Sequence, residues 1–228
     1  MKPTSVIVDS FNFSSGDAEM LFSGNNYSIE PVKSISIFEP YRWLETFGKS
    51  LTRNIVEAKI IHTFTGLTLA LKRYASSPLK QTVEFSGLNG YTEESTLLKK
   101  LLDELYQDIQ DEVINRIDVA IDFKGKIPKR VLTALQKTRR PFKWFNTTYF
   151  KTSKENKSNP KLNILMYPKH KKKNFLDYEL NRLEFSFRGG YFNKMKVKDM
   201  DKAYKKMQKS IKRLSGLDVE IEVLKTSL

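Results

Sequence analysis

The chain has 228 residues with 40 Lys and Arg against 26 Asp and Glu, which give a formal net charge of +14 at pH 7 and a pI near 9.7. This charge favours a polyanionic partner, with nucleic acid first and an acidic membrane surface as its rival. The lack of cysteine excludes disulfides and thiolate metal sites, and the lack of a long apolar run or a signal-peptide core predicts a cytoplasmic protein that enters no membrane.

The first part of the chain is expected to form mainly strands. Strands rich in β-branched and aromatic residues are predicted at residues 5–13, 34–38, 56–74 (two strands that turn near Thr65 and Gly66) and 81–86. The apolar spacing at residues 41–51 is that of a helix, and it follows a break at Pro40.

The second part alternates helices with strands. Thr92 is a typical N-cap, because two glutamates follow it in the first turn and leucines then recur at helical spacing as far as Ile109. Further helices are predicted at 129–137 and 199–214, the last of them ending before Gly216. Strands are predicted at 115–123, 147–151, 162–167 and 180–188.

The order of these elements favours an α+β fold. Most predicted strands have one apolar and one polar face, which is typical of an antiparallel or mixed sheet with helices on one side and an open face on the other. We expect residues 1–228 to form one intertwined domain. Two pseudo-duplicated halves, 1–90 and 91–228, also fit the order of the elements.

Three of the strands in the second part carry chemically active side chains on one face. Side chains alternate along a strand, so the apolar residues of each strand point one way and its polar residues the other. The polar faces carry Asp118, Asp122, Tyr167, Arg182 and Glu184. If the three strands are neighbours in one sheet, all five side chains converge on its open side.

Carboxylate oxygens are the ligands that hard divalent cations prefer. The predicted ligands of Mg²⁺ or Mn²⁺ are Asp118, Asp122 and Glu184.

The candidate nucleophile is the hydroxyl of Tyr167. Its ordinary pKa of about 10 means that a base or a cation must favour the phenolate. Lys169 would lie on the same face if the strand continued, where it could steady the phenolate or the scissile phosphate, and Arg182 is the third candidate catalytic side chain. The expected reaction is transesterification at a DNA phosphodiester, through a covalent phosphotyrosyl intermediate.

Each of these residues also has an ordinary structural interpretation. Acids on a polar strand face usually lie in water or pair with Lys or Arg, as Arg182 and Glu184 could do with each other. A tyrosine at a strand end is usually a rim residue with its hydroxyl in water. The presence of all these groups on one face of three strands favours the catalytic interpretation.

Five short motifs occur in order between residues 81 and 192: VEFSGLNGY, NRIDVAID, TTYFKTSKEN, LNILMYPKH and NRLEFSFRGGYF. In order and spacing the chain resembles rolling-circle replication initiators, both the plasmid and conjugative-element initiator family and the gene II protein family of filamentous phages. Tyr-Pro-Lys-His resembles the phage type, since plasmid-type members usually have an acidic residue after the tyrosine. No His-x-His motif is present, so the chain differs from relaxases that hold their metal with histidines.

The resemblance implies a ferredoxin-like fold, a divalent metal, Tyr167 as the nicking nucleophile and Asp118 as the acid of the Arg-Ile-Asp motif. It implies Asp122 less directly, because phage-type members need not keep a second aspartate. The implied partner is origin DNA, single-stranded or in a hairpin, in the cytoplasm of a prokaryotic host cell. It leaves open whether a host helicase docks, whether the chain forms a homodimer, and whether the host element is a plasmid, a phage or a transposon.

Basic loops near the active face are the expected contacts to DNA phosphates. The nominated side chains are Lys151, Lys154, Lys171, Lys172 and Lys173, with Lys137, Arg139, Arg140 and Lys143 beside Trp144.

The sequence therefore predicts a rolling-circle initiator that nicks and rejoins one DNA strand with a catalytic tyrosine and a metal. The first alternative is a non-enzymatic, RRM-like nucleic-acid-binding module, which would need exposed aromatic side chains on the open sheet face. The second is a primase-polymerase, whose catalytic sheet also uses paired acids.

Overall fold

The computed structural model describes residues 3–16, 18–22, 26–31, 54–74, 77–88, 92–152, 161–171 and 178–221. The strand expected at 34–38 and the helix expected at 41–51 lie outside these residues.

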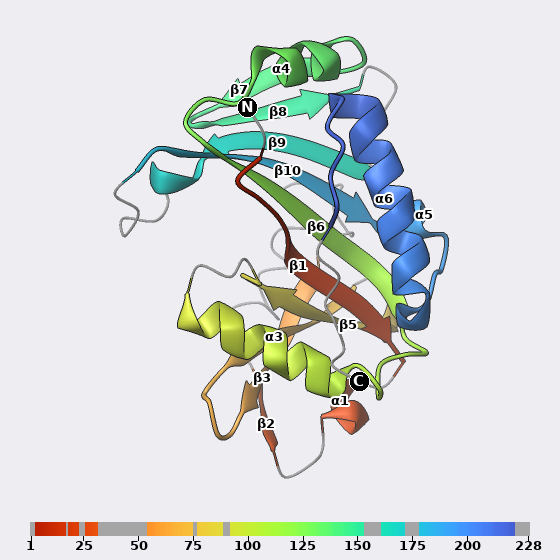
Figure 1. The fold of residues 1–228 in the computed structure, drawn as a ribbon. Coiled ribbons are helices and arrows are strands. Elements are labelled where there is room, and N and C mark those ends of the chain that lie inside the picture. Colours follow the sequence, from red (N-terminus) through yellow and green to blue (C-terminus); the bar gives the residue numbers. More distant parts are fainter. Residues whose placement is uncertain are drawn as a thin grey trace, which may run out of the picture.

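The described strands form one antiparallel sheet of ten, in the order β2-β3-β4-β5-β1-β6-β10-β9-β8-β7 (Figure 1). Their bounds are β1 Ser5–Ser15, β2 Tyr27–Pro31, β3 Asn54–His62, β4 Thr68–Tyr74, β5 Ser77–Ser86, β6 Val113–Lys124, β7 Arg140–Trp144, β8 Thr147–Lys151, β9 Leu162–Pro168 and β10 Leu180–Arg188. All the strands predicted within the described residues are present, whereas the short β2 and β7 were not expected.

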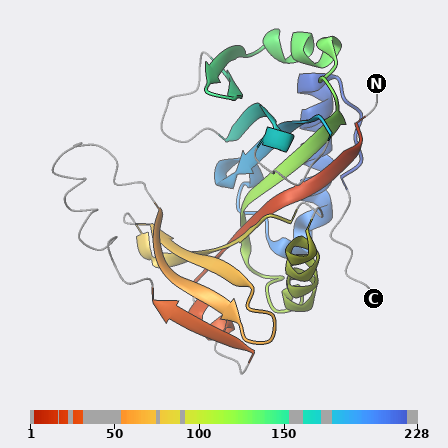
Figure 2. The ribbon, with the colours of Figure 1, turned by 90° about the vertical axis from the view of Figure 1, so that its left-hand side faces the viewer.

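The strand order of the sheet contains the same arrangement twice. In the first half a long strand, β1, is followed outwards by β5, β4, β3 and β2, and in the second half β6 is followed by β10, β9, β8 and β7. The two halves join along the antiparallel pair of β1 and β6, so the sheet is continuous between them (Figure 2).

The helices are α1 Ala18–Leu21, α3 Glu93–Leu105, α4 Lys129–Gln136, α5 Gly189–Phe192 and α6 Met200–Ser215, with 3₁₀ turns η1 Lys169–Lys171 and η2 Val197–Asp199. The hydroxyl of Thr92 accepts a hydrogen bond from the Ser95 N–H at the start of α3, as its N-cap position predicts. At the other end of the chain α6 stops at Gly216, whose φ of +71° suits a residue without a side chain.

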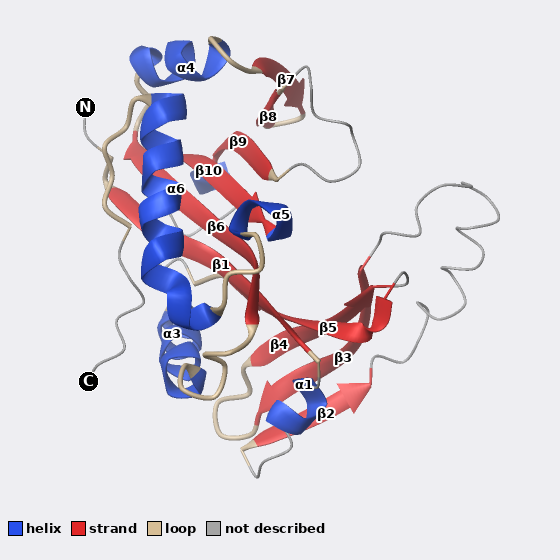
Figure 3. Ribbon diagram, turned by 90° about the vertical axis from the view of Figure 1, so that its right-hand side faces the viewer, coloured by secondary structure: helices blue, strands red, loops and turns tan. Residues whose placement is uncertain are grey.

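The two long helices, α3 and α6, lie along the same side of the sheet (Figure 3). The leucines of α3 and the stripe of Ala203, Met207 and Ile211 on α6 are buried in one core with the apolar strand faces. In β10, for example, Phe185 and Phe187 are fully buried there. The predicted α+β class, with helices over one face of an antiparallel sheet, is confirmed.

None of the helices in the described ranges is long and apolar enough to cross a membrane.

Candidate active site on strands β6, β9 and β10

The three strands predicted to share the active residues are neighbours, because β10 lies between β6 and β9. Arg182 of β10 faces Asp122 of β6 on one side and Tyr167 of β9 on the other. Directly opposed residues of antiparallel strands point to the same face. The predicted convergence on one face is therefore present, but the face is covered at this point: Tyr167 is 6% exposed and Glu184 8%.

The central contact of the site joins Tyr167 to Glu184. The Tyr167 hydroxyl donates a hydrogen bond of 2.9 Å to Oε2 of Glu184. Burial raises the pKa of Tyr167 above its ordinary 10.0 and the negative charge of Glu184 adds to this, while Arg182 opposes it. Burial also raises the pKa of Glu184, helped by nearby negative charges of Asp118 and Asp9. A phenol thus meets a buried carboxylate that accepts protons more readily than an exposed one.

Arg182 binds two carboxylates of the site. Its side chain is fully buried, and it binds both carboxylate oxygens of Asp122, with Nε–Oδ1 at 2.7 Å and Nη2–Oδ2 at 2.8 Å. Its Nη1 donates to Asp9 at 2.6 Å. Burial tends to lower the pKa of this guanidinium, but the two carboxylates outweigh burial and raise it. The guanidinium of Arg182 thus joins carboxylates of β6 and β1 inside the sheet.

Asp9 is a member of the site that the sequence patterns did not indicate. The pairing of β1 with β6 shifts register between Val8 and Ser10, so Asp9 occupies a β-bulge, and bulges re-aim a side chain. The break was visible in the sequence. The apolar residues of β1 that belong to the main core are Val8, Phe11 and Phe13, so one interval is three residues instead of two.

The predicted three-carboxylate metal site does not fit this arrangement. Arg116 binds both oxygens of Asp118, at 2.8 and 2.5 Å, as Arg182 binds both oxygens of Asp122. The described part of the chain contains no group of three or more His, Cys, Asp or Glu side chains placed to hold a metal ion. The two aspartates instead form forked ion pairs, since a buried carboxylate needs a charge partner.

Two buried polar atoms beside Asp118 and Arg116 have no hydrogen-bond partner in the described parts of the chain. These are Oγ of Ser186, which faces Asp118, and Oδ1 of Asn12, which faces Arg116. Both side chains are nearly fully buried. A buried polar atom without a partner costs free energy.

The end of β9 differs from the expectation for Lys169. The strand stops at Pro168 and the chain enters η1, so Lys169 does not continue the alternation of the strand. Its side chain is buried, and the condition for its expected place on the catalytic face, a strand that continues past Pro168, is not met. His170 is also held in place, since its Nδ1 accepts from the Leu180 N–H at 3.2 Å.

Apart from Arg139, the nominated DNA-binding residues fall into two groups. Arg140, Lys143, Lys151, Lys137 and Lys171 are exposed, whereas Lys154, Lys172 and Lys173 lie outside the described residues.

Arg139 is the exception among the nominated residues, because it is buried and its Nη1 donates to the Phe150 carbonyl at 3.2 Å. It therefore supports the fold of the β8 region.

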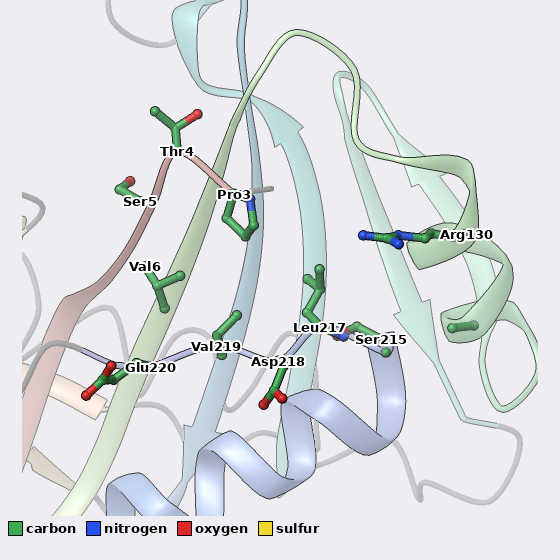
Figure 4. A pocket seen from close by; sticks show the side chains of 12 residues that line it. Pro3, Thr4, Ser5, Val6, Arg130, Ser215, Leu217, Asp218, Val219 and Glu220 are labelled. Atoms are coloured by element: carbon green, nitrogen blue, oxygen red, sulfur yellow. The ribbon is translucent and has the colours of Figure 1, made fainter. Parts of the chain in front are cut away.

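A separate hollow of about 690 Å³ lies between the start of β1, α4 and the chain that follows α6 (Figure 4). Its wall includes Pro3, Arg130, Asp218 and Glu220, and neither Tyr167 nor any other residue of the candidate site lines it. The mixed charges of this wall match no single ligand class.

No protein-family model matches the chain, and no curated protein matches it. Among solved structures, the chain is similar to a rolling circle replication initiator protein from Geobacillus stearothermophilus. The two are 18% identical with a TM-score of 0.40, over 81% of this chain and 74% of the other.

Proposed function

We propose that this protein nicks and rejoins one strand of DNA through Tyr167, in the role of a rolling-circle replication initiator. The observation that carries the proposal is the 2.9 Å hydrogen bond from the Tyr167 hydroxyl to Glu184. A nucleophile within hydrogen-bond reach of a base that other groups hold in place is the arrangement that covalent catalysis requires. The order of the five sequence motifs supports the DNA substrate, as does the charge of +14.

The reaction needs one bond to form and one to break. The Tyr167 oxygen attacks the phosphorus of a phosphodiester, and the bond from phosphorus to one sugar oxygen breaks. The phenolic proton passes to Glu184, and the departing sugar oxygen takes up a proton from water to become a hydroxyl. The phosphotyrosyl ester keeps the energy of the broken linkage, so attack by a sugar hydroxyl reverses the reaction and rejoins the strand.

Glu184 is the proposed general base. The raised pKa of its carboxylate brings it closer to neutrality, where a general base works best. The fork between Arg182 and Asp122 fixes the strand that carries Glu184, and the charge of Arg182 favours the phenolate. These residues bring the proton acceptor to the nucleophile before DNA binds.

The requirement for Mg²⁺ or Mn²⁺ stands as a proposal from the sequence motifs alone. We assign no step of the reaction to a metal, because Asp118 and Asp122 are already paired with arginines. Nicking in the presence and absence of EDTA tests the requirement directly.

The test is capture of the covalent intermediate. The protein is incubated with single-stranded DNA that contains its origin, with and without Mn²⁺, and a denaturing gel separates protein–DNA adducts. We expect an adduct with the unaltered protein and none with Tyr167→Phe. The matched control is Tyr149→Phe, because Tyr149 lies on the same face one strand away. An adduct that persists in Tyr167→Phe would exclude Tyr167 as the nucleophile.

A non-enzymatic single-strand-binding module is the second candidate, because one observation favours it. The sheet has exposed aromatic side chains on β7, among them Trp144, which is 59% exposed. DNA binding with no cleavage in any metal, and unchanged by EDTA, would favour this candidate.

A further inference from the structure

The hairpin of β7 and β8 carries an unusual concentration of exposed aromatic rings. Phe142 is 47% exposed, Trp144 59% and Phe145 82%. They lie within four residues, at the outer edge of the sheet (Figure 3). Exposed apolar groups gathered in one place mark an interaction surface.

The register of the sheet places two of these rings on the face of the candidate active site. Phe142 pairs with Tyr149, Tyr149 with Leu165, and Leu165 with Glu184. Opposed residues share a face, so Phe142 and Trp144 point to the same side of the sheet as Tyr167. Strands lie about 4.8 Å apart, so β7 runs roughly 10 Å from the strand of Tyr167.

The turn of the hairpin places an exposed aromatic residue in an unfavourable backbone conformation. Trp144 pairs with Thr147, which leaves Phe145 and Asn146 as the turn, and Phe145 has a φ of +48°. A bulky residue in this conformation costs free energy, and such strain is concentrated at functional positions. The rings of Phe145 and Trp144 meet edge to face, with centroids 5.4 Å apart.

Exposed cationic side chains lie on the same hairpin as the three rings. Arg140 and Lys143 of β7 and Lys151 of β8 are all exposed, and Lys151 Nζ lies 4.4 Å from the centroid of the Phe142 ring. Pro141 and these charges protect the free edge of β7 against pairing with another strand. A partner strand is therefore not expected at the edge of β7. Aromatic rings beside cations suit a polyanion that also has flat aromatic groups, rather than an apolar protein surface.

We propose that the aromatic hairpin, defined as Phe142, Trp144 and Phe145 with Arg140, Lys143 and Lys151, binds single-stranded nucleic acid by stacking bases on its rings. The cations bind the phosphates and the rings stack against the bases, which every nucleotide sequence provides. Its place on the face of Tyr167 means that it would hold the strand to be cut, and in this respect the inference rests on the proposed function.

The fluorescence of Trp144 tests the stacking directly. The chain has two tryptophans, so a Trp43→Phe variant leaves Trp144 as the only one. Tyr167→Phe is added so that the DNA is not cut during the measurement. We expect a single-stranded oligothymidylate to quench Trp144 strongly, and an abasic strand with the same phosphates to quench it weakly.

Binding affinity provides the second measurement. In the Tyr167→Phe background, Trp144→Ala should weaken binding of the oligothymidylate about 5- to 150-fold, the range for loss of one stacked base. Phe64→Ala is the matched control, because Phe64 is 79% exposed on a turn of the other half of the sheet. It should leave binding unchanged.

Three results would overturn the inference: equal quenching by the abasic strand, equal affinity in Trp144→Ala, or self-association of the protein through the hairpin with no response to DNA. Because binding is measured with Tyr167 removed, failure of the nicking proposal would leave these outcomes intact. Conversely, the protein could form an adduct at Tyr167 while Trp144 shows no stacking. That result would support the proposed function and exclude base stacking on the aromatic hairpin.

Discussion

The two halves of the sheet share a strand order and differ in what their strands carry on the face away from α3 and α6. In the first half this face has mainly small neutral residues such as Ser10, Asn12 and Ser14 on β1, with Glu84 opposite Asn12 on β5. Asp9 at the bulge of β1 is the exception, because it binds Arg182 of the second half. In the second half the corresponding strands bring together a tyrosine, a buried arginine and acids. The strand order alone therefore does not make the site, which depends on the side chains of one strand face.

Two tyrosines show the same contrast. Burial raises the pKa of Tyr27 in the first half to about 12, with help from Glu104 and Asp108. Its ring contacts the rings of Phe22 and His62, with centroids 5.1 and 5.3 Å away. Tyr167 also has a raised pKa, but its hydroxyl donates to Glu184. Tyr27 is partly buried and Tyr167 is buried, and the hydrogen bond to Glu184 is what makes Tyr167 the candidate nucleophile.

The largest expected effect is on the nicking rate. Glu184→Gln keeps the size of the side chain and removes its basicity, so we expect the rate to fall by about 10²- to 10⁴-fold. Glu84→Gln is the matched change on the corresponding strand of the first half and should leave the rate within a few fold. Single-turnover adduct formation measures both, and equal losses in the two variants would argue against Glu184 as the base.

The next effect is on stability. Arg182→Met leaves the carboxylates of Asp122 and Asp9 without their guanidinium, and breaking a buried ion pair in this way costs about 3–5 kcal/mol. Arg130→Met, at an exposed position on α4, should cost little. Urea denaturation gives both free energies of unfolding. A loss in Arg182→Met no greater than in Arg130→Met would mean that the fork contributes nothing to the fold.

A smaller effect compares two serines, one in each half. Ser14 Oγ and Ser186 Oγ are buried without a hydrogen-bond partner among the described residues, so Ala at either position should raise the free energy of unfolding by up to about 1 kcal/mol. Only Ser186→Ala should also weaken DNA binding, because Ser186 faces Asp118 in the candidate site. Equal DNA affinity in both variants would remove Ser186 from the ligand contacts.

The smallest effect concerns an exposed ion-pair cluster of the second half, which joins the segment before β6 to the segment before α6. Lys198 and Lys196 bind Asp111 at 2.7 and 2.9 Å and hold its pKa at about 2. A lowered pKa of an acid stabilises the fold above the ordinary value of 3.8, and this is lost as the pH falls toward about 2. Asp111→Asn should therefore lower the melting temperature slightly at neutral pH and not at low pH. Added salt should reduce the difference, since the pairs are exposed.

Much of the fold could be predicted because most strands alternate cleanly. The bounds of β8 and β10 match the predicted ranges, and the parity of β6, β9 and β10 placed Asp118, Tyr167 and Glu184 on one face. The strand β7 could not be found in this way, because all five of its residues are exposed and it contains Pro141. Its alternation is limited to Phe142, Lys143 and Trp144, which is too short a run to outweigh the proline.

The pairing partners of the site could not be predicted for a related reason. Alternation tells which face a carboxylate lies on, but not whether a cation or a metal will meet it there. Arg116 and Asp118 are two residues apart on one strand, whereas Arg182 reaches Asp122 and Asp9 from another part of the chain. The place of Asp9 in the site was not predicted, because its bulge reverses the alternation of side chains along β1.

The contact between Asp9 and Arg182 also has a consequence for how the molecule is made. The two residues are 173 positions apart in the chain. At about 5–20 residues per second of synthesis, Asp9 leaves the ribosome roughly ten to thirty seconds before Arg182 is added. Until then β1 has its neighbour β5 but not β10 beyond β6, so the centre of the sheet stays unfinished. The contacts of Arg182 with Asp9 and Asp122 can therefore form only after most of the described residues have been synthesised.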